Sequence, residues 1–239
     1  MIVIGTKLKV DNYQTAAELE STFVHNVYRS MAPYFCDPGQ QQPFGNKCSS
    51  SGCSAGYLWP RVTEFLAQFD TGALVADIGC GNGKYLCSRP SVSAFIIGSD
   101  LCGEILATAK HRNNDNYANG GAFIRNLKPS SSKTTSLSDV VQADNLFLPF
   151  REAIFDGVIS IAVIHHLSTE KRRFKAVEQC ANLLKPGGKL LIYVWAYEQR
   201  QRSFSSQDIL VPWKTSRTRR RSSSSSFARK SYTQQTSSY

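Results

Sequence analysis

The N-terminal part of the chain carries the apolar pattern of a helix. Four apolar residues recur at every fourth position: Leu19, Phe23, Val27 and Met31. This spacing places them on one helix face, and Thr15 followed by Glu18 has the spacing of an N-terminal capping box. The pattern predicts a helix over residues 15–31 that Pro33 ends, and a second short helix over Val62–Phe69.

Further along, short apolar runs alternate with helical segments. The runs predict five strands: Leu74–Ile78, Ala94–Gly98, Val140–Ala143, Phe155–Ile161 and Leu190–Trp195. Helices are predicted between them over Cys102–His111 and Thr169–Leu184, and Pro186-Gly187-Gly188 stops the second. Strands that alternate with helices form a parallel sheet covered on both faces. The predicted fold class is therefore α/β, with a Rossmann-like sheet.

Several segments lack this periodicity. Residues 36–57 are rich in Gln, Ser, Gly and Cys, and residues 112–139 in Asn, Ser and Lys, so we predict two loop insertions. Residues 1–14 are predicted to be a flexible start. The Ser/Arg-rich residues 214–239 have too few apolar side chains to fold alone. The expected organisation is one domain over 15–213 followed by a disordered tail.

Composition and charge narrow the class of protein. The chain has 239 residues, 41% of them hydrophobic, and contains no apolar run near the roughly 20 residues that span a bilayer. The net charge is +10, to which residues 214–239 contribute seven Lys or Arg and no acid. The basic excess belongs mainly to the tail, where it favours a polyanionic partner.

The cysteines predict neither a disulfide framework nor a metal centre. The chain has seven of them and no N-terminal secretion signal, so we expect free thiols in a reducing compartment. Cys48 and Cys53 have a Cys-x4-Cys spacing, but a zinc site needs two further ligands, and no His accompanies the nearby Cys36.

The strongest chemical signal is a glycine-rich turn after the first predicted strand, Asp77-Ile-Gly79-Cys80-Gly81-Asn-Gly83-Lys84. Glycines permit left-handed backbone and the close approach of a ligand. A phosphate-binding P-loop does not fit, because Ile78 occupies the position of its first glycine and Tyr85 follows Lys84. A dinucleotide-binding fingerprint fails at its third glycine, where Lys84 stands.

S-adenosylmethionine is the third nucleotide ligand that such a turn suits, and it carries no phosphate. Asp77 ends the first strand and suits the positive sulfonium and amino groups, whereas Asp100 ends the second and suits two ribose hydroxyls. Asp144 and Asn145 follow the third strand, where we expect contact with adenine. A glycine turn without a ligand, and a turn or capping role for Asp144, remain alternatives. Further cofactor contacts are predicted at Gly79, Cys80, Gly81, Gly83, Leu101, Ile161 and Ala162.

Two adjacent histidines, His165 and His166, follow the fourth predicted strand. Adjacent side chains of an extended chain point in opposite directions, so we expect only one of them to face the ligand crevice. Metal ligation by both is therefore disfavoured. The alternative is a histidine whose ring is satisfied by backbone groups.

Two groups of motifs add specificity. The first is Asp-Ile-Gly-Cys-Gly-Asn-Gly-Lys-Tyr (77–85), Ile-Ser-Ile-Ala-Val-Ile-His-His (159–166), Leu-Lys-Pro-Gly-Gly-Lys (184–189) and Ile-Tyr-Val-Trp-Ala (192–196). The second is His-Asn-Val-Tyr (25–28), Ala-Pro-Tyr-Phe (32–35) and Trp-Pro-Arg-Val (59–62). With these motifs, roughly residues 18–213 resemble the eukaryotic tRNA wobble-uridine carboxymethyl methyltransferases, which include the methyltransferase part of an AlkB-like dioxygenase fusion.

This resemblance implies a class I, type 11 methyltransferase that uses S-adenosylmethionine to esterify 5-carboxymethyluridine at the tRNA wobble position. The implied partners are tRNA and a small zinc-binding activator protein, and no membrane. Because the substrate carboxylate is already ionised near neutral pH, we expect positioning groups rather than a strong base. The candidate catalytic residues are Tyr28, Arg29, His165 and His166, and the candidate substrate-binding residues are His25, Arg61, Trp195 and Tyr197.

The chain departs from the family pattern after Val211-Pro212-Trp213, where the family fold continues with a further helix and an antiparallel strand pair. We therefore expect a sheet truncated after its fifth strand, which then presents an edge. Two other functions stay open: a catalytically silent module that binds S-adenosylmethionine or a partner, and a small-molecule methyltransferase. The expected location is the cytoplasm and the nucleus.

Overall fold

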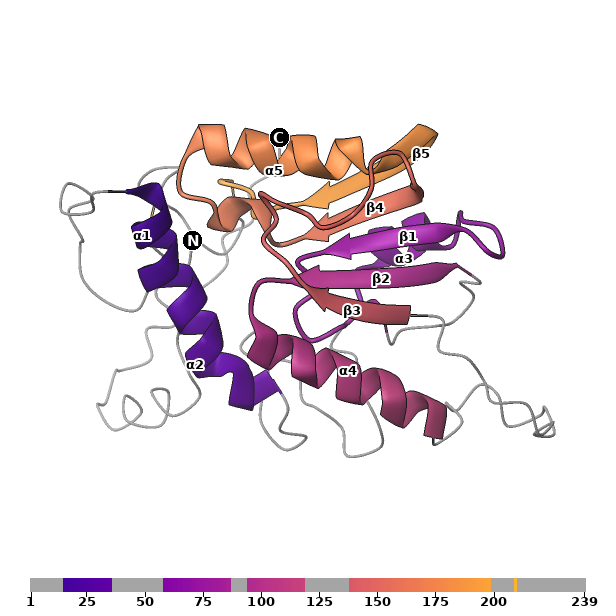
Figure 1. The fold of residues 1–239 in the computed structure, drawn as a ribbon, viewed down its shortest axis with the longest axis horizontal. Coiled ribbons are helices and arrows are strands. Elements are labelled where there is room, and N and C mark those ends of the chain that lie inside the picture. The colour runs from indigo at the N-terminus through magenta and orange to yellow at the C-terminus, as the bar shows by residue number, and fades with distance from the viewer. Residues whose placement is uncertain (1–14, 36–57, 87–93, 119–137, 199–208, 210–239) are drawn as a thin grey trace, which may run out of the picture.

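A computed structural model describes residues 15–35, 58–86, 94–118, 138–198 and 209. Within them, five parallel strands form one sheet with helices on both faces, and an N-terminal helical segment lies near the ends of the strands (Figure 1). This is the predicted α/β architecture. The predicted flexible start (1–14), first insertion (36–57) and basic tail (214–239) lie outside the described residues.

The sheet has the order β3-β2-β1-β4-β5. Its strands are β1 (Leu74–Ile78), β2 (Phe95–Asp100), β3 (Ser138–Gln142), β4 (Phe155–Ile161) and β5 (Leu184–Tyr193). β1 pairs with β2 on one side and with β4 on the other, so the strand order reverses at β1. In sheets of this kind, ligands bind at the carboxyl ends of the strands beside that reversal. β5 ends the sheet within the described residues, at the expected edge.

The helices connect and cover these strands. They are α1 (Ala16–Glu20), the π-helical turn η2 (Ser21–His25), α2 (Asn26–Phe35), α3 (Pro60–Leu66), α4 (Gly103–Ala118), the 3-10 turn η3 (Ile164–His166) and α5 (Glu170–Asn182). The predicted capping box is confirmed: the Thr15 hydroxyl accepts from Glu18 N, and the Glu18 carboxylate accepts from Thr15 N, both at 3.1 Å. Thr169 caps α5 in a similar way, with its hydroxyl accepting from Arg172 N.

Two helix ends differ from the prediction. Pro33 does not end the first helix but lies inside α2, which stops two residues later at Phe35, within one turn of the proline. α4 continues to Ala118 instead of stopping at His111, since the polar run after His111 has helical backbone without an apolar stripe. The second insertion therefore begins later than predicted.

The third and fifth strands also begin earlier than predicted. β3 starts at Ser138, inside the stretch predicted to be an insertion. β5 starts at Leu184, ahead of the Pro-Gly-Gly sequence, because its register against β4 shifts between Phe155 and Gly157 and the additional residues fit into that irregularity. Bulges of this type let a strand continue past residues that break regular pairing.

The core lies on both faces of the sheet. On β1, Val75 packs with Leu66 of α3 and Leu106 of α4, whereas Ile78 packs on the opposite face with Cys180 of α5. Each such buried aliphatic side chain contributes about 1.5–3 kcal/mol to stability. This two-sided burial fixes the ends of β1 and β4, from which the site is built. None of the described helices combines the length and apolar character needed to span a bilayer.

Candidate active site

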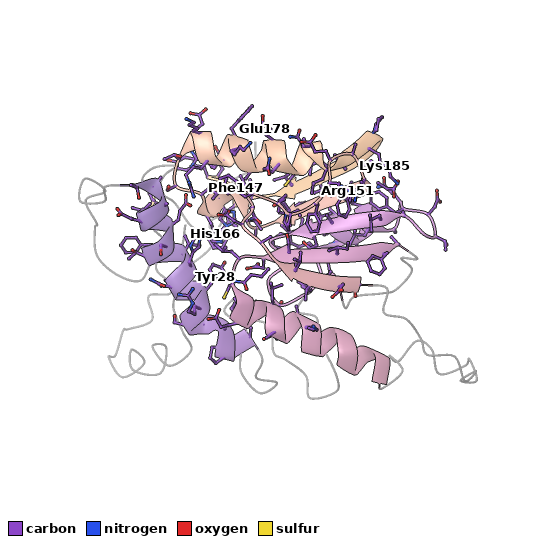
Figure 2. All side chains as sticks on the ribbon, in the orientation of Figure 1. Tyr28, Phe147, Arg151, His166, Glu178 and Lys185 are labelled. Carbon is purple, nitrogen blue, oxygen red and sulfur yellow. The ribbon has the colours of Figure 1, made fainter. Side chains whose placement is uncertain are left out.

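A cavity of about 850 Å³ lies at the carboxyl ends of the strands. Its lining includes Asp77 near the end of β1, Asp100 at the end of β2 and Asp144 after β3, and Val24 and Tyr28 contribute from the N-terminal segment. Figure 2 shows Tyr28 on α2 and His166 after β4 side by side at this edge of the sheet. The cavity therefore coincides with the crevice that the strand order predicts.

The glycine turn lets the backbone follow a path that other residues resist. Gly79, Gly81 and Gly83 have φ values of 80°, 54° and 73°, in the left-handed region. The N–H groups of Gly79 and Cys80 both donate to Ser99 O, at 2.7 and 2.8 Å, which holds the turn against β2. A Cβ on Gly79 would lie 2.3 Å from Val163 Cγ2, so the turn also needs close contact with the end of β4.

The third glycine serves the fold rather than the cavity. A Cβ on Gly83 would lie 2.9 Å from the Cβ of Ala109 on α4, and Gly83 is absent from the cavity lining. Gly83 was predicted to bind the cofactor, and the structure instead places it where α4 packs against the turn. Gly79, Cys80 and Gly81 do line the cavity.

Asp77 is a buried carboxylate that lacks a hydrogen-bond donor. Its residue exposure is 1%, and within the described residues neither carboxylate oxygen has a partner. Burial raises the pKa of Asp77 to about 7, and the nearby charge of Asp100 adds to this effect. An unsatisfied buried acid costs free energy, which a bound cation offsets. The ammonium group of a methionine moiety is such a cation.

Asp100 is held in a fixed orientation by backbone donors. Its Oδ2 accepts from Gly81 N and its Oδ1 from Cys102 N, both at 2.9 Å. Burial raises the pKa of Asp100, and these two hydrogen bonds partly oppose that rise. Each oxygen has a further lone pair. The geometry suits a pair of hydroxyls on adjacent ribose carbons.

The turn role considered for Asp144 at the end of β3 is observed, whereas its contact with adenine stays a prediction. Asp144 Oδ1 accepts from Leu146 N at 2.9 Å, so the carboxylate supports a turn, as the alternative interpretation held. Asp144 also lines the cavity, together with Asn145 and Leu101. The side-chain oxygen of Asn145 is buried without a partner within the described residues. These groups are placed to read the polar edge of a flat heterocycle.

One of the two histidines lines the cavity, as expected, but their side chains do not point in opposite directions, since their ring centroids lie 4.4 Å apart. They lie in the 3-10 turn η3 rather than in an extended segment, after Ala162, whose φ of 62° is unusual for a residue with a side chain. His166 lines the cavity, and its Nε2 lies 2.9 Å from the Tyr28 hydroxyl. His165 turns toward Trp195, with ring centroids 5.9 Å apart, and is not in the lining.

Electrostatics keep the imidazoles of the cavity neutral. Burial lowers the pKa of His166 well below its usual range, and the neighbouring His165 adds to that effect. Burial also lowers the pKa of His25, partly opposed by Glu20. Burial raises the pKa of Tyr28, so its hydroxyl keeps its proton. The region beside Tyr28 thus presents neutral hydrogen-bonding groups.

The other candidate catalytic and substrate-binding residues divide into two groups. His25, Tyr28, Arg29 and Trp195 line the cavity, as do the predicted cofactor contacts Ile161 and Ala162. Arg61 and Tyr197 do not: Arg61 is exposed on α3 and pairs with Glu64 at 3.4 Å, and Tyr197 is 41% exposed after β5. Arg29 forms a 3.2 Å ion pair with Glu104 of α4.

Several residues of the cavity lining were not predicted from the sequence. Lys84 Nζ lies 5.4 Å from the ring centroid of Trp59, and both line the cavity. Glu20 and Arg172 also line it and form an ion pair at 2.7 Å. One signal was available, because Glu20 precedes the buried Val24 by four residues and so shares its helix face. Arg172 gave no such signal.

The residues present fit S-adenosylmethionine. An unpartnered acid lies near the end of β1, an anchored acid ends β2, a third acid follows β3, and the turn departs from both phosphate-binding patterns. The described residues contain no group of three or more His, Cys, Asp or Glu that could hold a metal ion. The sheet order, the glycine turn and the acids at the strand ends are those of the class I S-adenosylmethionine-dependent methyltransferase fold.

Comparisons with known proteins give the same class and a narrower family. The family model described as "Methyltransferase domain" matches residues 76–192. "Probable tRNA methyltransferase 9B" of Homo sapiens is 41% identical over 198 residues, which are 83% of this chain and 34% of that protein. The chain thus spans about a third of the length of this relative and of its Mus musculus counterpart.

Two fungal proteins match over a larger share of their own length. The "tRNA (carboxymethyluridine(34)-5-O)-methyltransferase" of Schizosaccharomyces pombe is 35% identical over 201 residues, 82% of this chain and 69% of that protein. The Saccharomyces cerevisiae protein of the same name is 36% identical over 203 residues, 83% and 58%. The chain belongs to the family of the tRNA (carboxymethyluridine(34)-5-O)-methyltransferases, which confirms the resemblance found in its motifs.

Proposed function

We propose that this chain transfers a methyl group from S-adenosylmethionine to the carboxylate of 5-carboxymethyluridine at the wobble position of tRNA. The names of the fungal relatives support the substrate. The observation that carries the proposal is the division of the cavity: buried acids lie at the strand ends, while neutral hydrogen-bonding groups and Arg29 lie on the other side. The acids suit a cationic donor, and the other groups suit an anionic acceptor.

Bound S-adenosylmethionine supplies an electrophilic methyl group, and its transfer forms a C–O bond, breaks the C–S bond and leaves S-adenosylhomocysteine and a methyl ester. No proton has to be removed, so the cavity needs no general base. Asp77 would hold the ammonium group and Asp100 the ribose. Tyr28, His25 and Arg29 would orient the carboxylate, and positioning of this kind is worth up to about 10 kcal/mol of barrier in the best cases.

Methyl transfer to tRNA tests the proposal directly. The purified chain is incubated with labelled S-adenosylmethionine and total tRNA from cells that lack the wobble methyl ester. We expect label that appears as the methyl ester in nucleoside analysis and is released by mild base. An Asp77→Asn variant serves as the control, with both binding and transfer lost. Normal binding of S-adenosylmethionine with no label in tRNA would reject the substrate assignment.

We also propose a small zinc-binding activator protein as a partner and the cytoplasm and nucleus as the location, both supported by the family resemblance. Co-purification of the tagged chain with the activator tests the first, and the transfer assay is therefore run with and without the activator. Imaging of the tagged chain in cells tests the second. Signal confined to another compartment, or no co-purification, would remove these assignments.

We propose a role in tRNA affinity for the basic residues 214–239. They carry seven positive side chains and no acid. Each phosphate that a cation neutralises steepens the salt dependence of binding. Deletion of 214–239 should weaken tRNA binding and flatten the plot of log Kd against log salt concentration. An unchanged slope would show that the tail makes no phosphate contacts.

A further inference from the structure

The N-terminal segment 16–35 contains a buried acid that the proposed chemistry does not use. Glu20 is 1% exposed, although it is the last residue of a short helix. Its Oε1 accepts from Ser168 N at 2.7 Å, Ser168 Oγ at 2.8 Å and Arg172 Nε at 2.9 Å. Its Oε2 accepts from Arg172 Nη2 at 2.7 Å. Both carboxylate oxygens are therefore saturated.

Both members of the Glu20–Arg172 pair are charged, and their contact constrains the orientation of the two side chains. Burial alone would raise the pKa of Glu20, but the hydrogen bonds from Arg172 and Ser168 outweigh it and hold the pKa below its usual value. The same contact raises the pKa of Arg172. Bidentate contacts between guanidinium and carboxylate fix orientation as well as distance, and lysine does not reproduce them.

Glu20 stands directly before the segment that faces the substrate side of the cavity. The π-helical turn Ser21–His25 follows it and changes the direction in which the next side chains point. His25 ends this turn and lines the cavity, and Tyr28 follows on α2. Single-turn π-helices are frequent at functional sites.

Side-chain contacts to three elements help attach the segment to the rest of the domain, alongside the hydrogen bond that Ser168 Oγ donates to Ala16 O at 3.2 Å. Glu20 binds α5 through Arg172, Tyr28 contacts His166 of η3 at 2.9 Å, and Arg29 pairs with Glu104 of α4 at 3.2 Å. The Arg29 pair is solvent-exposed, with 59% and 50% of its side chains accessible, so it contributes little. Of these side-chain contacts, the Glu20 pair is the charged and buried one, with Glu20 1% exposed.

We propose that Glu20 is a positioning residue for methyl transfer, whose ion pair with Arg172 sets the position of segment 16–35 so that His25 and Tyr28 face the acceptor. This inference rests on the proposed function. It adds a residue that touches neither the donor acids nor the reacting atoms. Its expected signature is a loss of turnover with retained donor affinity, since Asp77 and Asp100 belong to the sheet edge.

The test compares two glutamates of one helix in the full chain. Glu20→Gln removes the ion pair, whereas Glu18→Gln is the matched control, because glutamine also completes a capping box. For Glu20→Gln we expect a loss in kcat of about tenfold to a hundredfold, as small misplacements of reacting groups cause. The Kd for S-adenosylmethionine should stay within about threefold of wild type. Glu18→Gln should match wild type in both.

Two measurements do not depend on tRNA. Hydrogen exchange should accelerate in residues 19–31 of Glu20→Gln and stay unchanged in β1 and β4. The imidazole ¹⁵N shifts of His166 should move in Glu20→Gln as they do in Tyr28→Phe, because both changes remove the contact of Tyr28 with His166. If wild type methylates no tRNA but these shifts move, the proposed function fails and the positioning role stands.

Three results would overturn the inference: unchanged kcat in Glu20→Gln, equal effects of Glu18→Gln, or unchanged exchange in 19–31. If Glu20→Gln does not fold, the same measurements are made on Arg172→Lys, because this variant keeps the positive charge and loses the bidentate contact. Lower kcat with normal donor affinity in Arg172→Lys supports the inference. Wild-type kcat in that variant contradicts it.

Discussion

The contact between Gly79 and Val163 gives a sharp prediction, because the same turn contains its own control. Gly79 and Gly81 both have left-handed backbone, at φ 80° and 54°, and both line the cavity. An added Cβ meets Val163 Cγ2 at 2.3 Å on Gly79 but meets nothing within 4 Å on Gly81. Alanine at either position therefore carries the same backbone strain, and alanine at Gly79 also carries a steric clash.

The expected losses of stability follow from the backbone strain and the steric clash. Left-handed backbone costs an alanine about 1–2 kcal/mol. Overpacking of a tight contact costs about 1–3 kcal/mol more. We expect Gly81→Ala to lower the free energy of unfolding by about 1–2 kcal/mol, which is a Tm shift of about 2–8 °C. Gly79→Ala should lose about 2–5 kcal/mol, the sum of both terms.

Urea denaturation and titration with S-adenosylmethionine measure the outcome. Gly79→Ala should also weaken binding of the donor, because the displaced Val163 side chain itself lines the cavity. The double variant Gly79→Ala/Val163→Ala removes the two Cγ atoms and should recover part of the steric loss, since Val163 Cβ would still lie 3.2 Å from the added Cβ. Equal losses for the two single variants, or no recovery in the double variant, would refute the reasoning.

Three further predictions concern other positions. Burial raises the pKa of Asp77 to about 7, and the ammonium group of the donor needs the ionised carboxylate, so the Kd for S-adenosylmethionine measured by calorimetry should rise about tenfold for each pH unit below 7. Without the donor, the folded state holds the Asp77 proton to higher pH than the unfolded chain does. The contribution of Asp77 to the free energy of unfolding should therefore fall as pH rises from the ordinary pKa of 3.8 toward 7. A flat profile between pH 5.5 and about 7 would contradict this linkage. Gly157→Ala should destabilise by about 1–3 kcal/mol in urea melts, because its Cβ would lie 2.2 Å from the Phe69 ring, and Phe69→Leu should restore part of the loss. Ala162→Gly should relieve left-handed strain at φ 62° and cost no more stability than Ala153→Gly, its counterpart at φ 53°; a larger loss would show that the Ala162 methyl group packs in the cavity wall.

The sequence predicted the central strands more accurately than their connections. β1 and β4 match their predicted bounds, because each is an apolar run that ends in a turn. The end of α4 was missed because its last turns carry polar residues on all sides, and periodicity then gives no signal. The start of β5 was missed because Pro186 and two glycines normally indicate a turn, and the register shift against β4 that accommodates them depends on tertiary pairing.

The site residues that could be predicted are acids that recur at the ends of successive strands. The residues that were missed come from segments far apart in the sequence that meet only in the folded chain. Asp77 and Asp100 could be found from their position after apolar runs. The ion pair of Glu20 with Arg172 joins residues 152 positions apart, so no local spacing indicates it. Arg61 was placed in the site by motif resemblance alone, whereas α3 directs it to solvent.

The chain's layout separates the two recognition tasks of a transferase. The acids suited to the donor come from the ends of β1, β2 and β3, whereas His25, Tyr28 and Arg29 come from one short helical stretch that precedes the sheet in the chain. Replacing this helical stretch by the corresponding segment of a homologue should therefore change which anionic group accepts the methyl group. The part of the cavity that suits the nucleoside of the donor should stay unchanged. Diversification of acceptors within such enzymes requires no rebuilding of the sheet.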